Sequence, residues 1–277
     1  MILFYHLTKG VLKIKKEKPI IYYSDELNDE FANDNLNPKI IDENYKYIHK
    51  SFFKILTHFF WYRCIAIPLA VIFLKLKYRH KKINYKILKP FKKQTVFLYG
   101  NHTNNIADPL LPTIISSPRR VNVLVNPANL NIPFIGKILP SLGAIPLPTT
   151  RKAYKNYKES LDFLVSKNRV ISIYPEKHIW PFYTKIRPFE VDSFRYAVDY
   201  EKATFSFTNI YKKRKYSKNP KMITYIDGPF YPNKDLARKD QIINLREQVY
   251  QQMVLRSKEN NIELIKYIKL GATTNEK

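Results

Sequence analysis

From about residue 94, the chain alternates short runs of β-branched and aromatic residues with longer stretches whose apolar positions recur at helical spacing. The first pattern is typical of buried strands, and the second is typical of helices that pack on a sheet. The predicted strands are residues 95–99, 121–125, 144–147, 169–174, 204–210 and 222–226. The predicted helices are residues 109–115, 152–167, 191–200 and 236–258. This alternation predicts an α/β domain with a mixed, largely parallel sheet flanked by helices.

A different pattern precedes this domain, because residues 51–82 are rich in apolar and aromatic side chains and end in a basic cluster. The longest uncharged run, residues 64–74, would form a helix of roughly 16 Å, whereas a bilayer core of roughly 30 Å needs about 20 residues. Aromatic residues before the run and Lys and Arg after it favour a helical segment that lies at a membrane interface or re-enters it. Pro68 predicts a kink in this segment. The alternative is a core helix with a solvated basic end.

The composition divides the chain into three parts. We expect an appendage at residues 1–50, a membrane-associating helical segment at 51–85, and the α/β domain at 86–277. Within the appendage, the acidic and Asn-rich residues 24–35 predict loops or capping turns, and the first residues lack the pattern of a secretory signal.

The charge of the 277-residue chain is strongly positive, with 48 Lys and Arg against 23 Asp and Glu, a formal net charge of +25. All of the excess lies in residues 51–277, since residues 1–50 carry equal numbers of basic and acidic side chains. Such a surface attracts nucleic acid, an anionic bilayer or phosphorylated substrates, although an AT-rich genome also inflates the Lys content. At 45% apolar residues the chain is too hydrophobic to be disordered, and the single Cys64 excludes a disulfide scaffold.

Acidic residues are nearly absent from the middle of the chain. From Tyr45 up to and including Lys158 the only one is Asp108, among twenty Lys and Arg. Codon bias explains abundant Lys, but it does not explain missing Glu, whose codons are also AT-rich. The lone carboxylate is therefore a candidate functional group.

Several common sites are excluded by their missing motifs. The chain has no Walker loop, no G-x-G-x-x-G fingerprint and no G-x-S-x-G elbow. Its six histidines show no metal-ligand spacing, so we expect no metal.

The remaining candidate is the loop that begins with Asn101 and His102, directly after the first predicted strand of the domain, and ends at Asp108. Open α/β sheets place ligands at the carboxyl ends of their strands. A carboxylate that folds back onto the imidazole would fix its tautomer and leave the other ring nitrogen free to take a proton. The alternative is structural, since Asn and Asp before an apolar helix are common capping residues.

The wider sequence resembles the glycerolipid acyltransferase superfamily, in particular the bacterial 1-acylglycerol-3-phosphate acyltransferases. The Asn-His-x4-Asp block of that family is similar to Asn101-His102 with Asp108. The Gly-rich block that leads to a phosphate-binding arginine is similar to residues 142–146, followed by Arg151. The third block, Phe-Pro-Glu-Gly-Thr-Arg with a following Lys and Pro-Phe pair, is similar to residues 174–178 and 185–189.

This chain departs from the family pattern at three points. The spacing here is His-x5-Asp, because Ala107 occupies the usual position of the acid, and a bulged loop could absorb the extra residue. Lys177 and His178 replace the Gly-Thr of the third block. The fourth block, expected at residues 205–210, lacks its central proline.

The resemblance implies an O-acyltransferase that moves a fatty acyl group from acyl-CoA or acyl-carrier protein to a lysophospholipid. The expected acceptor is 1-acylglycerol-3-phosphate, which gives phosphatidic acid. The resemblance also implies His102 as general base, oriented by Asp108. The implied substrate-binding residues around the acceptor phosphate are Arg151, Arg187, Lys185, Glu176 and Asn101, of which Glu176 is expected to anchor an arginine or the histidine loop. No cofactor is implied beyond the acyl donor.

The implied location is the cytoplasmic side of the bacterial cytoplasmic membrane, peripheral or re-entrant, with no nucleic-acid partner. Two alternatives stay open. One is a basic protein that binds nucleic acid or anionic membrane without catalysis, through Lys and Tyr stretches such as residues 211–216. The other is an acyltransferase for a different acceptor, such as an ornithine lipid or a glycolipid precursor.

Overall fold

The computed structural model describes residues 18–31, 37–48 and 51–271, and its centre is a seven-stranded sheet in the order β2-β8-β7-β3-β6-β4-β5. Every neighbouring pair in this sheet is parallel except β7 and β8, which are antiparallel. The strands are β2 (Lys81–Ile83), β3 (Val96–Gly100), β4 (Val121–Val125), β5 (Ala144–Pro146), β6 (Val170–Ile173), β7 (Ala203–Lys212) and β8 (Lys221–Phe230). The predicted mixed, largely parallel sheet is confirmed.

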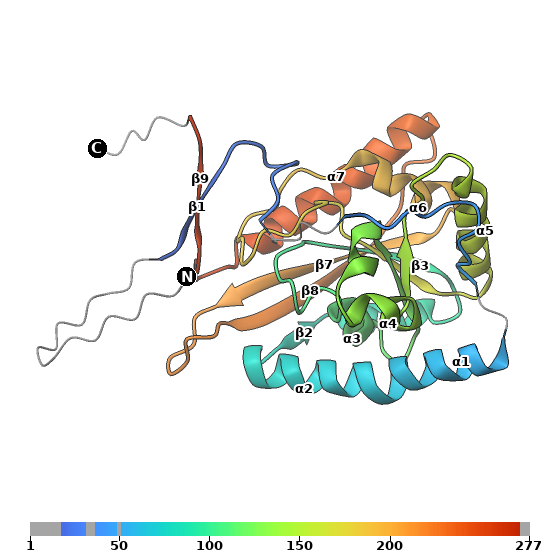
Figure 1. Ribbon diagram of the computed structural model, residues 1–277. Coiled ribbons are helices and arrows are strands. Elements are labelled where there is room, and N and C mark those ends of the chain that lie inside the picture. The colour runs from blue at the N-terminus through green and yellow to red at the C-terminus, as the bar shows by residue number, and fades with distance from the viewer. Residues whose placement is uncertain (1–17, 32–36, 49–50, 272–277) are drawn as a thin grey trace, which may run out of the picture.

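Helices cover both faces of this sheet (Figure 1). The α-helices of the domain are α3 (Leu111–Ser116), α4 (Ile135–Leu142), α5 (Ala153–Ser166), α6 (Arg195–Asp199) and α7 (Arg238–Ser257). Short 3₁₀ segments are Tyr85–Phe91, Pro127–Asn131 and Val191–Phe194. The sequence pattern did not predict α4, which contains Pro140, or the short strand β2.

Alternate residues of β3 enter two separate hydrophobic clusters. Val96 and Leu98 pack with α2 and α3 residues on one face, whereas Phe97 and Tyr99 pack with α5 and α7 residues on the other. This division follows from the two-residue period of a strand. Since β3 is buried on both faces, the loop that follows it starts from a rigid part of the core.

The apolar segment before the domain forms one continuous helical rod along one side of the molecule (Figure 1). It consists of α1 (Phe52–Phe59), a π-helical segment (Phe60–Ala66) and α2 (Ile67–Tyr78), and it continues through Pro68 in the first turn of α2. Residues Ile55–Tyr78 are long and apolar enough to cross a membrane by length and composition. The sequence reading stopped the apolar run at Arg63, but the Arg63 guanidinium turns toward the protein and donates to the Pro118 carbonyl.

One side of this rod packs against the domain and the other is exposed. The Tyr62 hydroxyl accepts a hydrogen bond from the Val121 backbone N–H at 2.9 Å, and it contacts the Thr113 hydroxyl at 3.2 Å. The exposed large apolar residues are Phe52, Phe53, Ile55, Leu56, Phe59, Phe60, Leu69, Val71, Ile72 and Leu76. The rod therefore presents an apolar face that the protein does not cover.

The described parts of residues 1–50 pack against the domain. Strand β1 (Ile20–Tyr23) pairs in parallel with β9 (Lys266–Lys269), and Ile41 bonds to Thr149. Residues 24–31 form the predicted turns, whereas residues 32–35 of that prediction lie outside the described residues. The division into residues 1–50, 51–85 and 86–277 stays a prediction.

Candidate active site

The imidazole of His102 and the carboxylate of Asp108 are in direct contact. The Nδ1 atom of His102 lies 2.8 Å from Oδ2 of Asp108, and the carboxylate is fully buried. His102 lies two residues beyond the end of β3, at the carboxyl edge of the parallel strands, where α/β sheets place ligands. The extra residue between them does not separate the pair.

A tight turn absorbs that extra residue. The Asp108 backbone N–H donates to the Asn104 carbonyl at 2.9 Å, which folds the loop back by one helical turn. The Asn104 side-chain oxygen accepts from the Ala107 N–H at 3.0 Å and supports the turn. Ala107, at the position where the family has its acid, is instead buried in the core.

The buried carboxylate of Asp108 is surrounded by donors. In addition to His102, its Oδ2 atom accepts from the backbone N–H groups of Thr103 and Asn104 at 2.8 and 2.9 Å. Burial raises the pKa of Asp108, and the hydrogen bonds from His102 and the two N–H groups oppose that rise. Because Oδ2 accepts from Nδ1–H, the neutral imidazole has a free lone pair on Nε2.

The His102 ring is held flat against Tyr174. The two ring centroids are 4.3 Å apart at an interplanar angle of 19°, and the Tyr174 hydroxyl donates to the Asp108 carbonyl. The His102 side chain keeps 16% of its surface exposed, which leaves the ring accessible from one side. The sequence analysis did not assign Tyr174 a role, although it lies in the third block.

Glu176 anchors the histidine loop. One carboxylate oxygen accepts from the His102 backbone N–H at 2.8 Å, and the other accepts from the Arg187 N–H at 3.0 Å. The Arg187 guanidinium lies 3.5 Å from the same carboxylate, and both side chains are fully buried. Glu176 therefore has the anchoring geometry that the sequence suggested.

Arg187, a predicted phosphate ligand, is buried in this structure and bound to protein groups, so its phosphate-binding role stays a prediction. Its guanidinium donates to the carbonyls of Glu26 and His178 and stacks on Trp180, with the cation 4.8 Å from the ring centroid. Burial lowers the pKa of Arg187, and Glu176 opposes that effect. The Arg187 side chain is fully buried among these partners, although its Nε atom has no hydrogen-bond partner among the described residues.

The Asn101 side chain is also bound to protein groups. Its side chain is buried, donates to the Asn209 carbonyl at 3.1 Å and accepts from the Asn209 N–H at 2.8 Å. These bonds fasten the end of β3 to β7. Both ends of the Asn101 amide are used within the core, and its substrate contact stays a prediction.

A buried polar chain that the sequence did not reveal leads to Asp108 from the opposite side. Asn209 on β7 donates a long hydrogen bond of 3.5 Å to Oδ1 of Asp108, and its oxygen accepts from the Thr224 hydroxyl at 2.7 Å. His80 Nε2 lies 2.8 Å from that hydroxyl, whose proton is already donated, so His80 is the donor. Each of the three hydrogen bonds from His80 through Thr224 and Asn209 is therefore donated in the direction of the Asp108 carboxylate.

Arg151 and Lys185 are the two predicted phosphate ligands whose side chains are exposed. Arg151 follows β5, which is three strands from β3 in the sheet, so roughly 14 Å separate the two strands. Both strands end at the same edge because all intervening pairs are parallel. Among residues 18–31, 37–48 and 51–271, no group of three His, Cys, Asp or Glu side chains could hold a metal ion.

A known protein family matches the part of the chain that contains this candidate active site. The Acyltransferase family model matches residues 82–211, a segment that contains the His102–Asp108 loop, Arg151 and the Glu176 block. Residues 82–211 are thus an acyltransferase domain, the protein is an acyltransferase, and the resemblance to the glycerolipid acyltransferase superfamily is confirmed.

A solved structure is also similar to this chain. It is the 1-acyl-sn-glycerophosphate (LPA) acyltransferase PlsC from Thermotoga maritima, with 15% identity, a TM-score of 0.39 and coverage of 76% of this chain and 97% of that chain. Among curated proteins, none shows significant sequence similarity to the chain.

Proposed function

We propose that the protein transfers a fatty acyl group from acyl-CoA or acyl-carrier protein to the free hydroxyl of a lysophospholipid, and that 1-acylglycerol-3-phosphate is the acceptor and phosphatidic acid the product. The observation that carries this proposal is the 2.8 Å contact between His102 and a fully buried Asp108 inside an acyltransferase domain.

The proposed reaction is a single displacement. The Nε2 atom of His102 accepts the proton of the acceptor hydroxyl as its oxygen attacks the thioester carbonyl, a contribution of roughly 10²–10⁴-fold. The C–O bond forms, the C–S bond breaks, and the leaving thiolate takes the proton back from the imidazolium. Asp108 holds the ring in the Nδ1–H tautomer and stabilises the positive charge of the transition state. No covalent acyl-enzyme is required, so Cys64 has no role in it.

The acceptor phosphate is assigned to Arg151 and Lys185. Both side chains are exposed, and Arg151 follows a strand that ends at the same edge as His102. An arginine fork binds phosphate through two parallel hydrogen bonds, which suits the headgroup of lysophosphatidic acid. An ornithine lipid or a glycolipid precursor remains the alternative acceptor.

The helical rod of α1 and α2 is proposed to rest on the cytoplasmic side of a bacterial cytoplasmic membrane. Its exposed face is apolar and aromatic, and Lys75, Lys77, Arg79 and Lys81 follow at its end. Because the opposite face packs on the domain, the rod is suited to lie in the interface beside the acyltransferase domain. This arrangement would supply the lysophospholipid acceptor from the bilayer, and we expect no cofactor and no nucleic-acid partner.

The test is acyl transfer from a labelled thioester to lysophosphatidic acid by the His102→Ala variant. We expect transfer to be abolished while vesicle binding and the far-ultraviolet circular dichroism spectrum stay unchanged. Asn105→Ala is the matched control, because this exposed residue lies in the same loop and should keep full activity. Undiminished transfer by His102→Ala would overturn the mechanism. Absence of transfer to any lysolipid by the unaltered protein would favour the non-catalytic alternative.

A further inference from the structure

A pocket of about 350 Å³ lies at the amino ends of β4 and β6, between the domain and α1. Arg120 directly precedes β4 and Arg169 directly precedes β6, so both lie at the edge of the sheet opposite His102. In the register of β3 and β6, Arg169 is seven residues from the level of His102, a separation of roughly 20 Å. The pocket is thus separate from the candidate active site.

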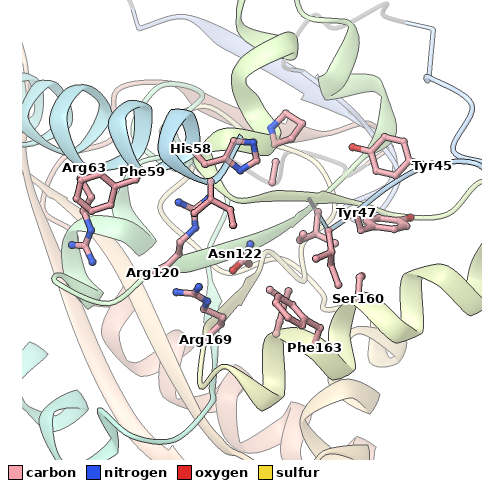
Figure 2. A pocket seen from close by; sticks show the side chains of 16 residues that line it. Tyr45, Tyr47, His58, Phe59, Arg63, Arg120, Asn122, Ser160, Phe163 and Arg169 are labelled. Carbon is pink, nitrogen blue, oxygen red and sulfur yellow. The ribbon is translucent and has the colours of Figure 1, made fainter. Parts of the chain in front are cut away.

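Three guanidinium groups gather on one side of this pocket. Figure 2 shows Arg63, Arg120 and Arg169 together, with Tyr45 and Tyr47 on the other side. Burial lowers the pKa of Arg120 and of Arg169, and the positive charge of Arg63 lowers both further. Within the part of the chain that the structure describes, no carboxylate forms an ion pair with any of the three. This uncompensated cation cluster is suited to an anion.

Two of the three arginines, Arg63 and Arg120, are held in place by neutral groups. Arg120 donates to the Ser141 carbonyl at 2.8 Å and lies over the Tyr62 ring at 4.5 Å from its centroid. Arg63 donates to the Pro118 carbonyl. The buried Asn122 also lines the pocket, and its side-chain oxygen has no hydrogen-bond partner. A ligand that offers both an anion and a hydroxyl group would satisfy these groups together.

Most of the remaining pocket wall is apolar, with His58 and Ser160 as polar members, and this wall continues onto the surface of the helical rod. Ile55 and Phe59 line the pocket and also belong to the exposed apolar face of α1. Phe163, Leu164 and Ile145 also belong to the apolar part of the wall. An anionic head beside apolar walls that open onto a membrane-facing helix is the environment that a phospholipid requires.

We propose that this pocket binds the phosphate headgroup of an anionic phospholipid, such as phosphatidylglycerol, from the bilayer on which α1 rests. The proposal depends on the membrane contact in the proposed function and is independent of the chemistry at His102. Arg169, whose guanidinium is held by no hydrogen bond that the structure shows, is the residue best placed to turn its fork to the phosphate.

The experiment measures partitioning of the full chain onto vesicles of phosphatidylcholine alone and of phosphatidylcholine with one third phosphatidylglycerol. We expect Arg169→Gln to weaken the phosphatidylglycerol-dependent affinity about tenfold, the loss of one charge-assisted hydrogen-bonded contact. Arg169→Lys keeps the charge but not the fork, so we expect an intermediate loss. Lys239→Gln is the matched control and should change affinity less than twofold, since this exposed residue lies in the first turn of α7, a helix on the other side of the sheet from the rod.

Three outcomes would overturn the proposal. If Arg169→Lys and the unaltered protein bound phosphatidylglycerol vesicles with equal affinity, the preference would come from overall positive charge and not from a defined headgroup site. Unchanged affinity of Arg169→Gln would exclude this pocket. Inorganic phosphate at millimolar concentration that lowers the affinity of the unaltered protein to that of Arg169→Gln would assign the pocket to a soluble anion.

The two proposals fail separately. His102→Ala removes transfer if the proposed function holds, and it should keep the full preference for phosphatidylglycerol. If His102→Ala abolishes acyl transfer and Arg169→Gln does not change vesicle binding, the lipid pocket is refuted and the acyltransferase mechanism is retained.

Discussion

His102 Nδ1 and Asp108 Oδ2 lie 2.8 Å apart across a loop that is one residue longer than the Asn-His-x4-Asp block of the resembled superfamily. The turn closed by the Asp108 N–H and the Asn104 carbonyl accommodates the additional residue. The longer spacing therefore preserves the geometry that a histidine base requires.

Asp108→Asn should lower kcat by about 100-fold or more, because the amide cannot stabilise an imidazolium and presents N–H to donors that already surround it. Steady-state transfer kinetics measure the change. Asp162→Asn, which alters an exposed carboxylate on α5, should leave kcat unchanged. An unchanged kcat for Asp108→Asn would show that His102 acts without its carboxylate.

Asn209→Ala should lower the free energy of unfolding by about 1–3 kcal/mol, because the buried Thr224 hydroxyl loses its acceptor. It also removes the donor to Oδ1 of Asp108, so we expect a several-fold fall in kcat. Chemical denaturation and transfer kinetics test both effects. Asn219→Ala, at an exposed turn, should show neither. If Asn209→Ala matched the unaltered protein in both, the chain from His80 would not support the site.

Arg187→Met should lower the free energy of unfolding by about 3–5 kcal/mol, because it leaves the Glu176 carboxylate buried without its cation. Lys234→Met breaks an exposed ion pair with Glu201 and should cost less than about 1 kcal/mol. Chemical denaturation compares the two. A well-folded Arg187→Met protein whose only defect is a raised KM for the acceptor would support Arg187 as a phosphate ligand.

Arg151→Gln should leave stability unchanged and raise the KM for lysophosphatidic acid about tenfold, since the side chain is exposed and its proposed contact is one charge-assisted hydrogen-bonded pair. The comparison with Lys239→Gln separates a local contact from the general loss of one positive charge. A KM equal to that of the control would place the acceptor phosphate elsewhere.

Burial lowers the pKa of His80 from 6.5 to about 4. Between pH 6.5 and pH 4, His80 is therefore protonated in the unfolded chain but neutral in the folded protein. The contribution of His80 to the free energy of unfolding is fully present above pH 6.5 and is lost as the pH falls through 4. The full loss from this group is about 3 kcal/mol. His80→Gln should be less sensitive to pH in denaturation experiments at pH 7.5 and pH 4. Identical pH dependence would show that folding does not lower the pKa of His80.

The parts of the fold that depend on local patterning could be predicted. The six strands read from the sequence all belong to the sheet, because each is a short run rich in β-branched and aromatic residues. Helix α4 could not be read, since Pro140 and the small number of helix turns hide its spacing. The rod was also underestimated, because Arg63 interrupts the apolar run and only the folded protein supplies its carbonyl partner.

The sequence by itself determined the α/β class, the site loop and the pair His102 and Asp108, because these depend on residue type and short spacing. Tertiary structure alone decided which charged residues face solvent. Arg187 and Arg151 are equivalent cations in the sequence, but the burial of Arg187 against Glu176 and Trp180 commits it to the core. The same holds for Asn209, Thr224 and His80, which become a chain of donors only when β2, β7 and β8 pair. Desolvation and hydrogen bonding between distant segments set these roles, and neither can be read from residue type.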